Sequence, residues 1–231
     1  MNMRHHRDNY FTSGQVMLLL FLTAAIAVAA PQNTVADKWE ATMTAFEKGD
    51  RENPPPEGGI VFVGSSSIRL WDLKKSFPNL PVINRGFGGS EVSDSVHYVD
   101  RIVIKYKPRT IVFYAGDNDI AHGESPEQVA SDVREFVAKV REKLPETTIL
   151  FLSIKPSGAR ANFRDKQEKA NAMIRQLVAE DQRFKFIDVG SVLLDKNGVP
   201  RPELFLDDRL HLNAKGYDLW NEILAPSLKS P

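Results

Sequence analysis

Short apolar runs alternate with longer amphipathic stretches through most of the chain. Runs of about four to eight apolar residues, rich in β-branched and aromatic types, predict strands that are buried on both faces. The predicted strands are residues 60–64, 81–86, 110–116, 148–154 and 184–190. Stretches in which apolar residues recur every three or four positions predict amphipathic helices. The predicted helices are residues 37–50, 93–106, 125–145, 164–182 and 214–228.

The alternation of strands and helices predicts an α/β fold. Parallel strands need long crossover connections, which helices supply. The expected architecture is therefore a three-layer α/β/α sandwich around a flavodoxin-like, doubly wound, five-stranded parallel sheet. Ser125 and Pro126 supply an N-cap hydroxyl and a first-turn proline for one helix. Residues 30–59, a helix followed by the proline-rich "NPPPEGG" linker, are expected to precede a main domain of residues 60–231.

Small, polar and titratable residues follow the predicted strands. In open parallel sheets, ligands bind beyond the carboxyl ends of the strands. The segments there are "GSSS" (64–67), "GFGGS" (86–90), "GDND" (116–119), "KPSGAR" (155–160) and, after the fifth strand, "DDRLH" (207–211). They supply a hydroxyl on a tight turn, free backbone N–H groups, an amide and an Asp/His pair. These are the parts of an acyl-transfer site, where a base activates a serine and fixed donors stabilise an oxyanion.

Each segment has a simpler interpretation when it is taken alone. A serine cluster after a strand is typical of a helix cap or a phosphate-binding turn, and "GFGGS" of a turn that needs positive φ. "GDND" alone is typical of an Asx-rich loop, and an Asp three residues before a His of a local hydrogen bond. The occurrence of all four segments in this order along the chain favours an acyl-transfer site. The residues alone leave open which of Ser65, Ser66 and Ser67 is the nucleophile. They also leave open whether Asp207 or Asp208 pairs with the histidine in a helical turn.

The same residues resemble the SGNH (GDSL-like) esterases and acylhydrolases. The four sequence blocks of that family occur here in the right order across residues 60–212. The Gly-Asp-Ser-(Leu/Ile) block resembles "GSSS", and the glycine block resembles "NRGFGG" (84–89). The Gly-x-Asn-Asp block matches "GDND", and the Asp-x-x-His block matches "DRLH" (208–211). Ser65 departs from the aspartate of the family's first block.

This resemblance implies a role for each site residue. Ser66 corresponds to the nucleophile, His211 to the general base, and Asp208 to the carboxylate that orients the base. The Ser66 N–H, the Gly89 N–H and the Asn118 amide correspond to the oxyanion hole. The resemblance implies neither a cofactor nor a metal. A helical turn would then point Asp207 away from the site.

Other polar and aromatic residues are weaker candidates. Trp39, Trp71 and Trp220 are expected to be core or pocket-wall residues, with Trp71 the best candidate among them for contact with substrate. Arg160 is either a ligand for a substrate anion or a surface arginine. His122 is expected to be a structural or surface group. Together with Asp117 and Asp119 it lacks the spacing of a metal site.

The N-terminal segment has the pattern of an export signal. Arg4 and Arg7 precede an apolar run that ends in the small-residue triplet at 27–29. We interpret residues 1–29 as a signal peptide, because the apolar run is too short to cross ~30 Å of hydrocarbon comfortably. The mature protein is then exported, periplasmic or secreted, and has no stable membrane span. The chain contains no cysteine, which excludes disulfides and a lipid-attachment thiol.

Composition narrows the class of partner. The 231 residues are 42% hydrophobic and carry 30 basic and 30 acidic side chains without a like-charge block, which argues against nucleic acid as a partner.

The expected function is that of a secreted serine esterase forming an acyl-serine intermediate. Short loops without an apolar lid favour short-chain or carbohydrate-linked acyl groups. The alternatives are a lysophospholipase-like acylhydrolase and a non-catalytic, phosphate- or ligand-binding flavodoxin-like envelope protein. The oligomeric state is left open.

Overall fold

A five-stranded parallel sheet forms the centre of the protein. The structure, a computed structural model, describes Met1, Met3 and residues 35–229. The strand order is β2-β1-β3-β4-β5, and every neighbouring pair is parallel. This confirms the flavodoxin-like, doubly wound topology. The strands are β1 Ile60–Gly64, β2 Val82–Gly86, β3 Thr110–Tyr114, β4 Thr148–Leu152 and β5 Phe184–Ile187.

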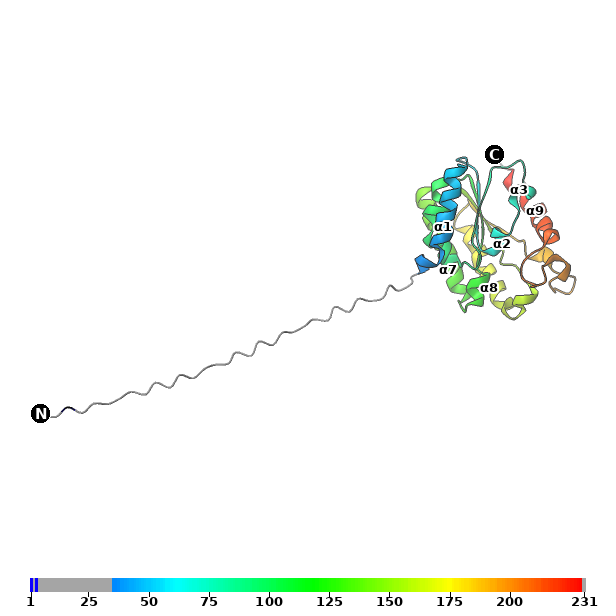
Figure 1. Cartoon of the computed structure of the whole chain (residues 1–231). Coiled ribbons are helices and arrows are strands. Elements are labelled where there is room, and N and C mark those ends of the chain that lie inside the picture. The colour runs from blue at the N-terminus through cyan, green and yellow to red at the C-terminus, as the bar shows by residue number, and fades with distance from the viewer. Residues whose placement is uncertain (2, 4–34, 230–231) are drawn as a thin grey trace. The chain divides into compact units, whose positions relative to one another are not determined.

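Helices cover both faces of the sheet, which confirms the three-layer architecture (Figure 1). One face is covered by α1 Val35–Glu52, α4 Val92–His97, α5 Val99–Ile102, α7 Pro126–Lys143 and α8 Arg164–Gln176. The other face is covered by α2 Ser66–Arg69, α3 Leu73–Ser76 and α9 Ala214–Leu228. The short helix α6 Asp117–Ala121 follows β3.

Two apolar cores arise from the alternation of side chains along each strand. In β1, Val61 and Val63 face the core under α7 and α8, whereas Ile60 and Phe62 face the core under α9. Successive strand side chains point to opposite faces, so a strand covered on both sides must be apolar throughout. All five residues of β1 and of β3 are buried. The continuous apolar runs in the sequence follow from this requirement.

The predicted helix at 93–106 is divided in the structure. It consists of α4, α5 and a 3₁₀ turn, Ile104–Tyr106, which ends at Lys107 with a left-handed φ of 45°. The apolar residues of this stretch still reach the core, and the chain bends between them. By contrast, α7 begins as predicted, because the Ser125 hydroxyl accepts a hydrogen bond from the Gln128 N–H at 3.1 Å.

Helix α1 is anchored to the sheet by packing and by charge. Met43 is buried in the core, and Phe46 packs against it. Asp50 forms an ion pair with Arg85 of β2 and accepts a hydrogen bond from the Tyr106 hydroxyl at 2.6 Å. The predicted signal peptide at 1–29 lies outside the described residues apart from two methionines. No helix in residues 35–229 is long and apolar enough to cross a membrane.

Candidate active site

The first serine turn follows β1 directly and exposes one hydroxyl. Gly64 ends β1 with φ +130°, and a Cβ there would lie 1.9 Å from the Tyr114 carbonyl oxygen. Only glycine fits this position, because the backbone is left-handed and the neighbouring strand is in contact. The chain then turns into α2, whose first residue is Ser66. The turn places Ser66 at the carboxyl edge of the sheet.

Ser66, His211 and Asp208 form a continuous hydrogen-bonded chain. The His211 Nε2 lies 2.9 Å from the Ser66 Oγ, and the His211 Nδ1 lies 2.5 Å from the Asp208 Oδ2. The serine and the histidine are 145 residues apart in sequence. The fold therefore brings together the three residues that the sequence resemblance selects. This is the arrangement in which imidazole can take a serine proton while a carboxylate holds the ring.

The Asp208–His211 pair is held by a turn that is not helical. The Asp208 Oδ1 accepts hydrogen bonds from the Leu210 and His211 N–H groups, both at 2.9 Å, and Arg209 has a left-handed φ of 55°. The expectation of a helical turn at this segment is wrong. The carboxylate reaches its partner because its own side chain organises the turn, as Asp commonly does.

The same contacts stabilise the ionised form of Asp208. Burial alone would raise the pKa of its carboxyl. Hydrogen bonds from the His211 ring and from the backbone N–H groups of His211 and Leu210 outweigh burial and lower the pKa to about 2. Asp208 is therefore a carboxylate at any pH near neutrality. Its neighbour Asp207 is exposed and has no hydrogen bond or ion pair with the described part of the chain.

Three potential oxyanion donors lie in the turns after β1, β2 and β3. The Ser66 N–H is in the first turn of α2, where N–H groups have no acceptor within the helix. Gly89 has φ +82°, a left-handed backbone conformation that residues with a side chain rarely adopt. Asn118 is buried, and its amide donates one hydrogen to the Ser90 carbonyl at 2.9 Å. An amide has two N–H groups, so one remains for a substrate oxygen.

A buried carboxylate that the sequence suggested only as a weak metal ligand lies between two of these turns. The Asp119 Oδ1 accepts from the Val92 N–H at 2.7 Å, and the Oδ2 accepts from the Gly116 N–H at 3.0 Å. Burial raises the pKa of Asp119 to about 7. Asp119 is the last residue of the Gly-x-Asn-Asp block, which was the one indication of a role that the sequence offered. Sequence spacing does not show that its carboxylate bonds to a backbone group of a distant loop.

A second buried charged group lies beside Asn118. The Lys155 side chain is 1% exposed, and its Nζ lies 3.8 Å from the Asp117 Oδ2. Gln167 donates to the Asp117 Oδ1 at 2.9 Å. Burial lowers the pKa of Lys155, and the Asp117 carboxylate opposes that shift. The Arg160 Nε lies 4.0 Å from the same carboxylate, so this arginine faces Asp117.

Two further sequence candidates, Trp71 and His122, make contacts other than the Ser66–His211 hydrogen bond. The Trp71 ring packs among Phe62, Tyr217 and Trp220, and its Nε1 donates to Asn221 at 3.0 Å. His122 is exposed, and its Nδ1 lies 2.5 Å from a Glu91 carboxylate oxygen. Within residues 35–229, no group of three or more His, Cys, Asp or Glu side chains is placed to hold a metal ion.

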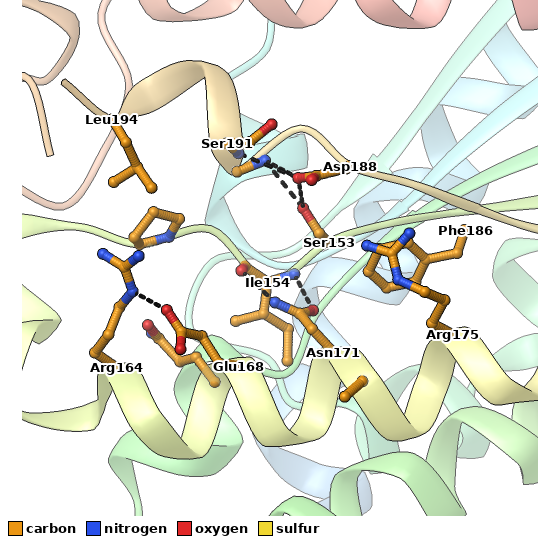
Figure 2. A pocket seen from close by; sticks show the side chains of 14 residues that line it. Ser153, Ile154, Arg164, Glu168, Asn171, Arg175, Phe186, Asp188, Ser191 and Leu194 are labelled. Carbon is orange, nitrogen blue, oxygen red and sulfur yellow. Dashed lines mark hydrogen bonds and ion pairs between the residues drawn. The ribbon is translucent and has the colours of Figure 1, made fainter. Parts of the chain in front are cut away.

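Two pockets flank this edge of the sheet. Figure 2 shows one of about 290 Å³ between α8 and the segments that follow β4 and β5, where Asn171 bonds to the backbone of Ile154. Ser66 and His211 are not among its lining residues. The other pocket, of about 490 Å³, lies between α2, α3, α9 and the segment that carries His211. Trp71, Leu70, Leu206 and Leu212 line it. Ser66 and His211 do not line this pocket either, although Leu212 is the residue that follows His211 in the chain.

Fold and site together define a serine hydrolase that cleaves ester bonds. Residues 69–219 match the GDSL-like Lipase/Acylhydrolase family, and the chain belongs to this family. The match begins three residues after Ser66, so the serine turn is supported by its geometry rather than by the matched range. Membership of a hydrolase family excludes the alternative of a non-catalytic binding protein.

The chain is similar to proteins named as ester hydrolases, and solved structures among them share its fold. The alpha1 subunit of platelet-activating factor acetylhydrolase IB from Homo sapiens is 27% identical over 187 residues, which are 78% of each chain. A GDSL-like lipase from Bacteroides thetaiotaomicron superposes with a TM-score of 0.69 at 17% identity, covering 82% of this chain and 98% of that one. Axe2, an acetylxylan esterase from Geobacillus stearothermophilus, superposes with a TM-score of 0.61 at 14% identity, covering 76% and 96%.

Proposed function

We propose that the protein hydrolyses short-chain carboxylic esters, including carbohydrate-linked acetyl groups, through an acyl-enzyme on Ser66. The hydrogen-bonded chain from Ser66 through His211 to Asp208 is the observation that carries this proposal. A serine hydroxyl is a weak nucleophile unless a neighbouring base accepts its proton. His211 is within proton-transfer distance of the hydroxyl oxygen and is bonded to a carboxylate on its other ring nitrogen.

In the first half of the reaction, the Ser66 Oγ bonds to the carbonyl carbon of the ester. The hydroxyl proton passes to the His211 Nε2, and the carbonyl oxygen becomes an oxyanion that accepts from the Ser66 N–H, the Gly89 N–H and the Asn118 amide. The carbon–alkoxy bond then breaks, and the leaving alcohol takes the proton from Nε2. Asp208 keeps Nδ1 protonated, so that Nε2 is the nitrogen that exchanges the proton.

In the second half, water replaces the alcohol. The His211 Nε2 removes a proton from water, whose oxygen bonds to the acyl carbon. Collapse of the second tetrahedral intermediate breaks the bond to Ser66 Oγ, which recovers its proton from the imidazolium. The carboxylic acid leaves, and the enzyme returns to its starting state.

Two observations support a small acyl group. Two of the similar proteins are named for acetyl esters, an acetylhydrolase and an acetylxylan esterase. The turns that carry Ser66, Gly89 and Asn118 run directly into helices, with no apolar lid between these motifs. A small, soluble ester needs no lid, because it brings little apolar surface that must leave water.

One observation favours the lysophospholipase-like alternative. Leu70 and Leu206, which line the pocket next to the segment that carries His211, are exposed, and apolar side chains there suit a longer acyl chain. The two candidates differ in the chain length that the enzyme prefers.

A substrate series separates these candidates. We expect the mature enzyme to hydrolyse p-nitrophenyl acetate and an acetylated xylo-oligosaccharide, with kcat/KM falling as the acyl chain lengthens. A kcat/KM that rises with chain length, together with release of fatty acid from lysophosphatidylcholine, would establish the alternative. No turnover of any of these esters by folded protein would refute the proposed function.

We also propose that the protein is exported and that residues 1–29 are removed. The proposal is supported by the basic residues, the short apolar run and the small-residue triplet at the N-terminus. Mass spectrometry of the protein from a periplasmic or culture fraction tests it. The proposal requires a chain that begins near residue 30, and an intact N-terminus in the cytoplasmic fraction alone would contradict it.

A further inference from the structure

We propose that Asp119 is a positioning residue that holds the two oxyanion loops of the ester hydrolase at a fixed separation. The oxyanion loops are residues 86–92, which carry Gly89, and residues 116–119, which carry Asn118. Asp119 lies in the second loop, and its side chain is completely buried. This proposal rests on the proposed function, since it concerns the donors assigned to the oxyanion.

The Asp119 carboxylate binds one backbone group from each loop. Its Oδ1 accepts from the Val92 N–H at 2.7 Å, three residues beyond Gly89. Its Oδ2 accepts from the Gly116 N–H at 3.0 Å, two residues before Asn118. The Asn118 amide adds a third tie, because it donates to the Ser90 carbonyl at 2.9 Å. Displacement of either loop would stretch at least one of these bonds.

Only a carboxylate of this size satisfies both partners. Val92 and Gly116 each present an N–H, so the side chain between them must offer an acceptor oxygen to each. A carboxyl group has two acceptor oxygens in either protonation state, whereas an asparagine of the same shape has one acceptor oxygen and an NH₂ group. An Asp119→Asn side chain would therefore face one backbone N–H with its own N–H. A buried N–H without an acceptor is costly, so the loop should shift to relieve the contact.

The charges around Asp119 are acidic and oppose its ionisation. Glu91 and Glu124 are the carboxylates whose charges act on it, and the Glu91 side chain contacts His122. Asp94 accepts from the Glu91 N–H at 3.0 Å and so fixes the first loop independently. The two backbone N–H groups are the partners that Asp119 contacts directly. Its role is thus explained by the loops it joins and not by an ion pair.

The role predicts a specific kinetic pattern. We expect Asp119→Asn to lower kcat for p-nitrophenyl acetate by roughly 10- to 100-fold with little change in KM, because misplaced oxyanion donors weaken transition-state binding. Asp132→Asn is the matched control. Asp132 is also a buried carboxylate, but it lies on α7 and accepts from Gln128 at 2.7 Å. We expect the control variant to keep kcat within about threefold of wild type.

A double-mutant cycle shows whether Asp119 acts through the oxyanion hole. Asn118→Ala alone should lower kcat by roughly 10²- to 10³-fold. In the Asn118→Ala background, Asp119→Asn should cost much less than it does in wild type, since the donor that it positions is already missing. Asp119→Glu, which keeps both acceptor oxygens but displaces them, serves if Asp119→Asn does not fold. It should show the same loss of kcat and the same non-additivity.

The outcomes separate this proposal from the proposed function. A normal kcat with a lowered melting temperature for Asp119→Asn would show a purely structural role and overturn the positioning proposal. Fully additive effects in the cycle would overturn it as well. If Asn118→Ala also has a normal kcat, the oxyanion assignment itself fails, and the positioning proposal fails with it.

Discussion

The three consecutive serines after β1 have different environments. Ser65 is buried and its N–H donates to the Tyr114 carbonyl at 3.0 Å, while the Ser67 carbonyl accepts from the Tyr217 hydroxyl at 2.8 Å. Ser66 alone among them contacts His211. Ser65, which replaces the family's aspartate, occupies the N-cap position of α2, but its side chain makes no cap hydrogen bond.

We predict that Ser66→Ala abolishes ester turnover, with a loss of kcat on the order of 10⁴-fold or more, because no other hydroxyl in residues 35–229 is hydrogen-bonded to the His211 ring. Ser65→Ala and Ser67→Ala should keep most of the activity. Steady-state kinetics on p-nitrophenyl acetate, with circular dichroism to verify folding, measures all three. An inactive Ser65→Ala or Ser67→Ala beside an active Ser66→Ala would identify a different nucleophile.

The two adjacent aspartates before His211 should behave very differently. Asp208→Asn should lower kcat by several powers of ten, since the amide favours the wrong imidazole tautomer and cannot support the imidazolium. Asp207→Asn should remain within about tenfold of wild type, because Asp207 is exposed and forms no hydrogen bond or ion pair with the described residues. The reverse ranking of kcat would reassign the carboxylate. Equal small losses would indicate a Ser–His dyad.

At this scale the sequence resemblance selected the three residues that form the Ser66–His211–Asp208 hydrogen-bonded chain, but not the reasons for their geometry. Asp208 was selected by resemblance, and the helical turn that spacing suggested does not exist, because the Asp208 side chain itself bonds to the Leu210 and His211 N–H groups. Asp119 was considered only as a weak metal ligand. Its partners are backbone groups of Val92 and Gly116, and no sequence pattern reveals that two N–H groups will converge on one carboxylate.

Among the secondary elements, the strands were the most predictable. A strand covered on both faces must be apolar, so β1 and β3 could be located directly. The predicted runs 110–116, 148–154 and 184–190 continue past the strand ends, since the residues just beyond a strand can also be buried. The division of α4 from α5 was missed, because both helices present apolar residues to one core.

Asp119, which bonds to the turns that follow β2 and β3, should make the stability of the protein depend on pH. The pKa of Asp119 is raised by burial from an ordinary value of 3.8 to about 7. Stability from this group is therefore fully present below about pH 4 and is lost as pH rises to about 7. We expect the difference in unfolding free energy between wild type and Asp119→Asn to fall across that range and to level off above it. Urea unfolding at several pH values measures this difference, and a pH-independent difference would refute the raised pKa.

At the scale of the whole molecule, the fold concentrates chemistry at one edge of a sheet. Ser66, Asn118 and Lys155 follow β1, β3 and β4, and the parallel strands bring these distant segments together. The order of motifs along the chain was therefore enough to predict the architecture and the gathering of these turns at one edge of the sheet. The anchoring of α1 by the Asp50–Arg85 pair could not be predicted, because ion pairing between distant residues depends on the finished fold.

The central claim is that Ser66 carries the acyl group during ester hydrolysis. Intact-protein mass spectrometry after brief reaction with a p-nitrophenyl ester at low pH, followed by peptide mapping, tests it directly. We predict a single adduct with the mass of the acyl group on the peptide containing Ser66, and no adduct in Ser66→Ala. An adduct on another residue, or rapid turnover by Ser66→Ala, would contradict the account.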